Sequence, residues 1–76
     1  MKSREVFHLR NGTVKSFDDV KGYGWIVPTD GTKDHFVHQR NILGDDVRTL
    51  PIDAKVTYES RSNDKGLEAI NVSLNK

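Results

Sequence analysis

Two short stretches near the middle of the chain, residues 21–27 and 34–38, constrain the fold most. Read as β-strands, each places alternate side chains on opposite faces of a sheet. An Asp-Gly pair between the two stretches favours an antiparallel hairpin. Adjacent strands of this kind would bring three aromatic rings and one imidazole onto the same surface: Tyr23, Trp25, Phe36 and His38.

Glycine alternates with the rings in the first stretch, as Gly22 and Gly24. Charged residues surround the connecting turn, so this segment does not have the composition of a simple core. Rings on a sheet surface are suited to holding unpaired bases, because every base has a flat face that can stack. Core packing of the same rings is the alternative on the residues alone, because aromatic side chains are usually buried.

Three further segments, 13–17, 54–60 and 67–74, combine apolar alternation with flanking turn residues and are predicted to be strands. Residues 41–44 indicate a single helical turn that ends at glycine. The chain therefore has five short predicted strands and no long helix. We predict an all-β domain, a small five-stranded antiparallel β-barrel, because closure removes the exposed edges of an open sheet.

Strict alternation predicts which side chains face inward in the first and last predicted strands. In residues 13–17 it places Val14 inward and Lys15 and Phe17 outward. An outward Phe17 requires either a ligand contact or a β-bulge in the strand. In residues 67–74 the same rule places Ile70 and Val72 on one face, with the more polar side chains opposite.

Seventy-six residues form a single small domain. Residues 1–10 are weakly patterned and are predicted to be a flexible N-terminal extension of a domain that spans residues 11–75. The chain has no cysteine, which suits a reducing compartment. Its apolar runs are far shorter than the ~20 residues that span a bilayer, and it has no signal-peptide pattern. A cytoplasmic protein without membrane contact is therefore expected.

Twelve basic and eleven acidic residues give a formal net charge of +1, so a strongly basic footprint is missing. No nucleophile and base are spaced for catalysis, and a small closed barrel leaves little room for a cleft, so no enzyme is predicted. His35 and His38 are three residues apart, which on a strand places them on opposite faces. We therefore predict neither a metal nor a cofactor.

Residues 21–26 (KGYGWI) resemble the first ribonucleoprotein motif of the cold shock domain family, K-G-F/Y-G-F-I, and residues 35–38 (HFVH) resemble its second, V-F-V-H. The similarity extends over residues 12–72. The family fold is an OB-type barrel that binds single-stranded RNA and DNA. The resemblance implies a protein of the bacterial cold shock type, an RNA chaperone that affects transcription or translation. It would act as a monomer, with a weak dimer as the alternative.

The match to the motifs also implies roles for individual residues. Bases would stack on a platform of four side chains: Tyr23, Trp25, Phe36 and His38. Lys15, on the first strand, would contact the nucleic-acid backbone or a base edge. Further basic groups would lie near the rim of the platform: Lys21, Arg48 and Lys65. Phe17 and Gln39 complete the predicted nucleic-acid-binding set.

The chain departs from the family pattern at three aromatic positions. Ser16 stands where the family usually has tryptophan, Gln39 stands for a phenylalanine, and Val47 stands for a loop aromatic. Trp25, which is larger than the usual phenylalanine, recovers some stacking area. Each base–aromatic stack contributes about 1–3 kcal/mol, so weaker binding than that of a complete platform is expected. Gln39 and Arg40 could instead hydrogen-bond to base edges.

His35 is a further departure, because the family has valine or isoleucine at this inward position. The imidazole either is buried and hydrogen-bonded or reaches water at a barrel end. An alternative function also stays open. The near-neutral charge and the missing rings are compatible with a barrel that serves as a protein-interaction module, with a partly eroded nucleic-acid face.

Overall fold

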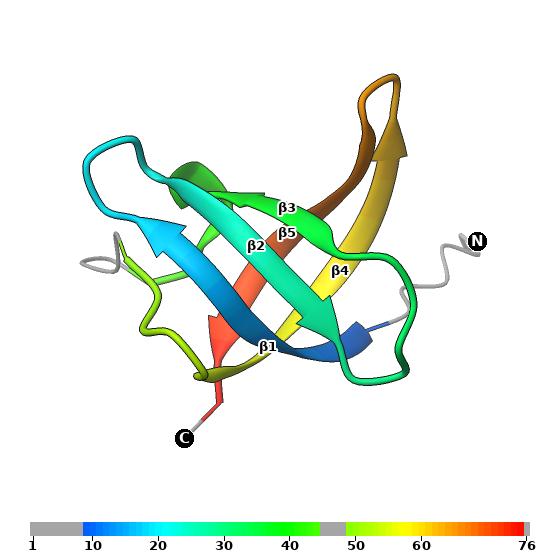
Figure 1. Ribbon diagram of the computed structural model, residues 1–76, viewed down its shortest axis with the longest axis horizontal. Coiled ribbons are helices and arrows are strands. Elements are labelled where there is room, and N and C mark those ends of the chain that lie inside the picture. The colour runs from blue at the N-terminus through cyan, green and yellow to red at the C-terminus, as the bar shows by residue number, and fades with distance from the viewer. Residues whose placement is uncertain (1–8, 45–48, 76) are drawn as a thin grey trace, which may run out of the picture.

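The computed structural model describes residues 9–44 and 49–75 and contains five β-strands and one short 3-10 helix (Figure 1). The strands are β1 (Leu9–Asp18), β2 (Tyr23–Pro28), β3 (His35–His38), β4 (Lys55–Asn63) and β5 (Gly66–Leu74), and the helix is η1 (Gln39–Asn41). They form a closed barrel in the order β1-β2-β3-β5-β4. The predicted five-stranded all-β barrel is confirmed, with one difference: the pairing of β3 with β5 is parallel.

Strand β1 is longer than predicted because it pairs on both sides. Residues 9–13 pair with β4, and residues 12–18 pair with β2. The strand therefore belongs to both halves of the barrel. Figure 1 shows it crossing the molecule diagonally beside β2 before it turns back at residues 19–22.

A β-bulge in β1 overturns the alternation predicted for this strand. Val14 pairs with Ile26 and Ser16 pairs with Trp25, so Lys15 is an extra residue without an opposite partner. The side chains of Lys15 and Ser16 are both exposed, and the side chain of the next residue turns toward the barrel interior. Phe17 is therefore half-buried and packs against the core. The outward position from strict alternation was wrong, and the β-bulge, the alternative for this strand, is confirmed.

A second irregularity shifts the register of β5 against β4. The shift falls between Thr57 and Glu59, opposite Asn71, which has a φ of 51°. Asparagine is among the few residues that adopt this left-handed conformation at moderate cost. As a result Ala69 and Val72 both face the core, and Ile70 is only half-buried. The prediction that Ile70 and Val72 share a face was wrong for this reason.

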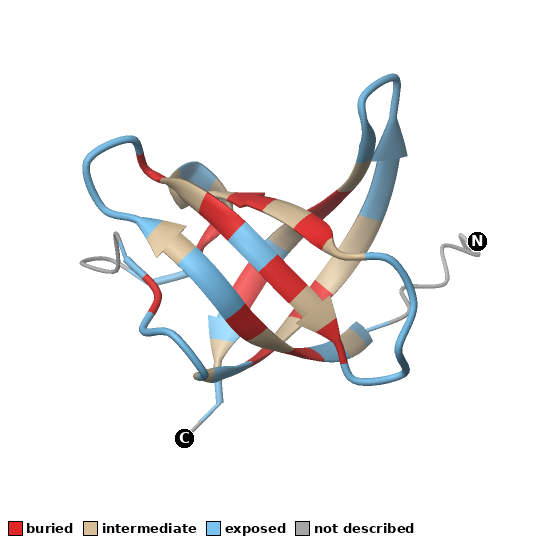
Figure 2. Cartoon of the chain, viewed as in Figure 1, coloured by how far each residue is buried: buried red, intermediate tan, exposed pale blue. Residues whose placement is uncertain are grey.

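The core collects the inward-facing residues of every strand, and Figure 2 shows the resulting alternation of buried and less buried positions along β2. Two core residues come from the connection between η1 and β4. The buried hydrophobic residues are Val14, Ile26, Val37, Ile42, Leu50, Val56, Tyr58, Ala69 and Val72. This single small core holds the outer surfaces of the strands in fixed positions.

His35 is buried in this core, with only 1% of its surface exposed. Its Nδ1 donates to the carbonyl oxygen of Lys33 at 3.0 Å, and its Nε2 accepts from the hydroxyl of Ser60 at 2.7 Å. The ring lies 5.2 Å from the ring of Tyr58. Both ring nitrogens have hydrogen-bond partners, so the imidazole is buried and hydrogen-bonded and does not reach water at a barrel end. Burial lowers the pKa of His35 and favours the neutral ring.

Candidate nucleic-acid interface

The antiparallel pairing of β2 with β3 sets the positions of the four predicted platform residues. Trp25 lies opposite Phe36, and Tyr23 lies opposite His38. The remaining residues of the pairing face the barrel interior and are buried: Gly24, Ile26, His35 and Val37. The structure therefore brings the four rings together on the outer surface of β2 and β3, which we call the aromatic platform.

The platform rings touch one another but are not covered. The Phe36 ring lies between those of Tyr23 and Trp25, with centroid distances of 5.5 Å to Tyr23 and 5.6 Å to Trp25. The Trp25 ring meets Phe36 edge-on, at 72°, whereas Tyr23 is tilted by 38°. Trp25 is 42% exposed, and the other three platform residues are half-buried. Exposed rings in edge-on and tilted contact leave faces on which further flat groups can stack.

Gly24 allows β1 to approach β2 closely behind the platform. A Cβ atom at this position would lie 2.1 Å from the carbonyl oxygen of Ser16 and 2.7 Å from the Cα of Phe17. The close approach places Ser16 beside Trp25, exposed and on the same outer surface. Phe17, which was predicted as a contact residue, follows on the core side. The platform therefore has a small hydroxyl group where the family resemblance implies a ring.

The turn between β1 and β2 is held against the other end of the platform. The Asp18 carboxylate accepts from the backbone N–H groups of Val20 and Lys21, both at 2.9 Å, and the bond from Lys21 is the main cause of the lowered pKa of Asp18. Gly22 has a φ of 78°, and its Cβ would lie 2.8 Å from the carboxamide of Gln39. The N–H of Gln39 donates to the carbonyl of Gly22. These contacts place Gln39 at the edge of the platform.

His38 links the platform to η1. Its Nδ1 accepts from the backbone N–H of Arg40 at 3.1 Å, which caps the start of the helix. The neutral ring therefore carries its proton on Nε2, where it can donate to an acceptor on a ligand. Arg40 is exposed next to this cap.

The predicted basic residues lie around the platform at different distances from it. Lys15, at the bulge, forms an exposed ion pair with Asp34 at 3.3 Å, and exposed pairs of this kind are weak enough for a phosphate to replace the carboxylate. Lys21 is exposed in the turn after β1, and Lys65 is exposed in the turn between β4 and β5. Arg48 lies outside the described residues.

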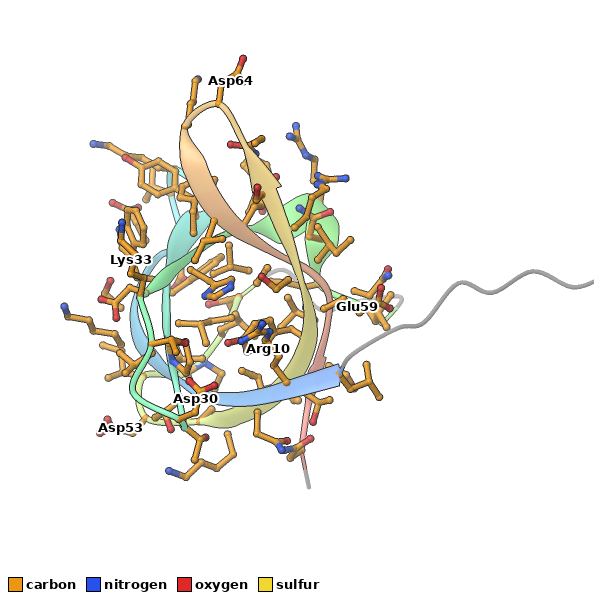
Figure 3. All side chains as sticks on the ribbon, turned by 90° about the vertical axis from the view of Figure 1, so that its right-hand side faces the viewer. Arg10, Asp30, Lys33, Asp53, Glu59 and Asp64 are labelled. Carbon is orange, nitrogen blue, oxygen red and sulfur yellow. The ribbon has the colours of Figure 1, made fainter. Side chains whose placement is uncertain are left out.

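An open groove of about 770 Å³ continues the platform toward the β4–β5 hairpin. Trp25 and Phe36 of the platform line it, together with Leu67 of β5. In Figure 3, Lys33 lies at the flank of the barrel and Asp64 lies at the tip of the hairpin, and both line this groove. The lining has balanced charge, with three basic and three acidic side chains: Lys33, Arg40, Lys65, Asp34, Asp64 and Glu68.

The sequence did not predict that Lys33, Asn63, Leu67 and Glu68 belong to this region. Lys33 was visible as a charge beside the second motif, which is a signal that could have assigned it to the site. The other three lie in β4 and β5, more than 20 positions further along the chain than the second motif. Only the closure of the barrel by the β3–β5 pairing brings them next to the rings.

No group of three His, Cys, Asp or Glu side chains within residues 9–44 and 49–75 is placed to hold a metal ion. His35 points into the core, whereas His38 lies on the platform, so the two do not converge. In the same part of the chain, no helix has the length and apolar character needed to cross a membrane.

Comparison with known sequences identifies the relatives of this chain. Residues 10–75 match the family model described as 'Cold-shock' DNA-binding domain. Cold shock protein 1 of Lactiplantibacillus plantarum is 47% identical over 64 residues, which cover 84% of this chain and 96% of that protein. Cold shock-like protein CspC of Escherichia coli K12 is 44% identical over 62 residues, covering 82% and 90% of the two chains.

Comparison with solved structures supports the same fold. The Drosophila structure named Unr CSD456 matches 92% of this chain with a TM-score of 0.76 and 21% sequence identity. This chain spans 28% of that longer chain. At this identity the match concerns the barrel fold.

Proposed function

The chain belongs to the cold-shock DNA-binding domain family, a family of non-enzymatic nucleic-acid-binding proteins, and on that premise we propose that it binds single-stranded RNA and DNA by base stacking. The observation that carries this proposal is the aromatic platform. Its rings lie on the outside of the barrel, with Trp25 42% exposed, although the core behind them is complete. Exposed rings of this kind suit bases that are not already paired and stacked.

The proposed mechanism divides the nucleotide between two kinds of contact. Bases stack on the four platform residues, and the Nε2–H of His38 donates to a base or a phosphate. Phosphates are neutralised by exposed cations around the platform and groove: Lys15, Lys21, Lys33, Arg40 and Lys65. The family resemblance adds Arg48 to this set. Gln39, at the edge of the platform, hydrogen-bonds to a base edge. A duplex is excluded because its base faces are already stacked.

We further propose that the chain acts as an RNA chaperone in the cytoplasm, as a monomer, with effects on transcription or translation. A protein that binds only the unpaired form of an RNA shifts the equilibrium toward that form by mass action. Weak hairpins would therefore melt in its presence. The high identity to bacterial cold shock proteins supports this role.

Trp25 fluorescence tests the binding function directly, because Trp25 is the only tryptophan of the chain. Titration with a short single-stranded pyrimidine oligonucleotide is expected to quench it, and the matching duplex is not. Affinity should fall with added salt by ~0.7 logarithmic units per contacted phosphate for each tenfold rise in salt. Because three family rings are replaced, the affinity is expected to be weaker than low nanomolar at physiological salt.

One observation favours the second candidate, a protein-interaction module. The groove lining is electrically balanced, and Lys15 is already paired with Asp34. Absence of quenching by single strands at low salt would support that function and reject nucleic-acid binding. A steep loss of affinity with added salt would reject the interaction module as the main role.

A further inference from the structure

Glu68 is a carboxylate that is buried on the outer side of the barrel. It pairs with Phe36 in the parallel β3–β5 ladder, so its side chain leaves β5 on the same side as the platform rings. It is nevertheless only 6% exposed, and it lines the groove next to Trp25 and Phe36. A buried carboxylate is costly unless it is hydrogen-bonded, so its contacts indicate what it is positioned to do.

Three side chains hold this carboxylate in one orientation. Its Oε1 accepts from the guanidinium of Arg61 at 3.0 Å and from the amide of Asn63 at 3.1 Å. Its Oε2 accepts from the amide of Asn41 at 3.0 Å. The hydrogen bond from Arg61 is the main cause of the lowered pKa of Glu68, so the group is ionised at neutral pH.

The two carboxylate oxygens are not equally occupied. A carboxylate has about four acceptor positions, two on each oxygen. Oε1 uses both of its positions, on Arg61 and Asn63, whereas Oε2 uses one, on Asn41. Among residues 9–44 and 49–75 no further donor bonds to Oε2, so one of its acceptor positions can take a donor from a ligand. The other two groove carboxylates differ, because Asp34 is paired with Lys15 and Asp64 is exposed at the hairpin tip.

We propose that Glu68 selects a base that carries an exocyclic amino group, with cytosine as the preferred case. The proposal rests on the proposed function and names the class of base that the groove accepts. An ionised carboxylate can only accept, and the N4 amino group of cytosine donates where uracil and thymine present a carbonyl oxygen. A base that stacks on Trp25 or Phe36 and extends into the groove brings its edge toward Glu68. An amino group there gains a charge-assisted hydrogen bond, whereas a carbonyl oxygen is repelled.

The test compares hexamers that differ only in their bases. Quenching of Trp25 is measured for oligo(dC) and oligo(dT) with the wild-type protein and with Glu68→Gln. The wild-type protein is expected to prefer oligo(dC) by about tenfold or more, the lower end of the factor expected from one hydrogen bond to a charged group. The Glu68→Gln variant keeps an oxygen for Arg61 but adds N–H donors, so the preference should shrink to within about twofold. Glu59→Gln, the same change on β4 outside the groove lining, is the matched control and should leave the preference unchanged.

A ligand-side measurement covers the case in which Glu68→Gln does not fold. With the wild-type protein, an oligonucleotide of N4,N4-dimethylcytosine has no amino donor and should bind no better than oligo(dT). Equal binding of oligo(dC) and oligo(dT), or of the methylated and unmethylated cytosine strands, overturns the inference and leaves the proposed function intact. Absence of quenching by every strand overturns the proposed function and the inference with it.

Discussion

The outer surface of β2 and β3 differs from the outer surface of β4 and β5, although both cover the same core. The first carries the aromatic platform, whose rings contact one another and solvent. The second carries polar side chains that bind each other. The hydroxyl of Thr57 donates to Asn75 at 2.8 Å, and the amide of Asn71 donates to Glu59 at 3.1 Å.

This difference separates the part of the surface that can bind from the part that stabilises. Polar side chains that already hydrogen-bond to each other have few donors and acceptors left for a ligand. A ligand that bound there would have to replace hydrogen bonds that already exist. Exposed rings contribute little to the core, so their stacking area is available to a ligand. Changes on the platform should therefore alter affinity, and changes on β4 and β5 outside the groove should alter stability.

The largest expected effect is on affinity. Trp25→Ala should weaken binding of a single-stranded oligonucleotide by about 5- to 150-fold, because one base stack contributes roughly 1–3 kcal/mol. Isothermal titration calorimetry measures this without the tryptophan signal. The melting temperature should change little, because Trp25 is 42% exposed. Thr57→Ala, on the outer surface of β4, is the control and should bind with wild-type affinity. Equal losses of affinity in both variants would show that the two outer surfaces do not differ in binding.

The second effect is on stability. Asn71→Ala should destabilise the fold by about 1–2 kcal/mol, because alanine adopts the left-handed conformation at φ 51° less easily and cannot bond to Glu59. Urea unfolding measures the change. Asn71→Gly removes the same hydrogen bond but tolerates the backbone, so it should cost less. Oligonucleotide affinity of both folded variants should match that of the wild type, and a loss would show that the two surfaces are coupled.

The third prediction concerns a variant with an additional ring on the platform. Ser16→Trp places a ring on the exposed position that pairs with Trp25 and should tighten binding by about fivefold, the lower end of the value of one base stack. Competition with a labelled oligonucleotide reports the change. Ser73→Trp puts the same ring on the exposed outer side of β5 and should give no gain. Equal tightening in both variants would point to unspecific stacking on any surface ring.

The smallest expected effect concerns pH and the buried His35. Its pKa is lowered in the folded state, mainly by burial, so between the folded value and the ordinary value of 6.5 the unfolded chain binds the extra proton. Stability is therefore full above about pH 6.5 and falls as the pH decreases below it. Urea unfolding between pH 7.5 and pH 5 measures this, before the carboxylates begin to titrate. In His35→Val the free energy of unfolding should change less with pH in this range. If it changes as steeply as in the wild type, a group other than His35 causes the pH dependence.

Local sequence rules were sufficient for the platform. Period-two alternation in residues 21–27 and 34–38, with an Asp-Gly turn between them, placed four rings on one surface, and β2 and β3 pair in that register. The same rule failed at Phe17 and Ile70. In both strands one residue breaks the alternation, Lys15 at a bulge and Asn71 in a left-handed conformation. An outward Phe17 already suggested a bulge in the first strand, but a bulge exists only relative to the partner strand, so alternation within one strand could not locate it.

The sequence by itself therefore determined the strand composition, the family, the barrel class and the grouping of the four platform rings. Tertiary structure alone decided that Ser60, 25 positions away, would meet His35 in the core, and that Arg61, Asn63 and Asn41 would converge on Glu68. It also decided that the platform would continue into a groove against the β4–β5 hairpin. The physical reason is that alternation depends on neighbouring residues, whereas these contacts depend on the register of strands that closure brings together from distant parts of the chain.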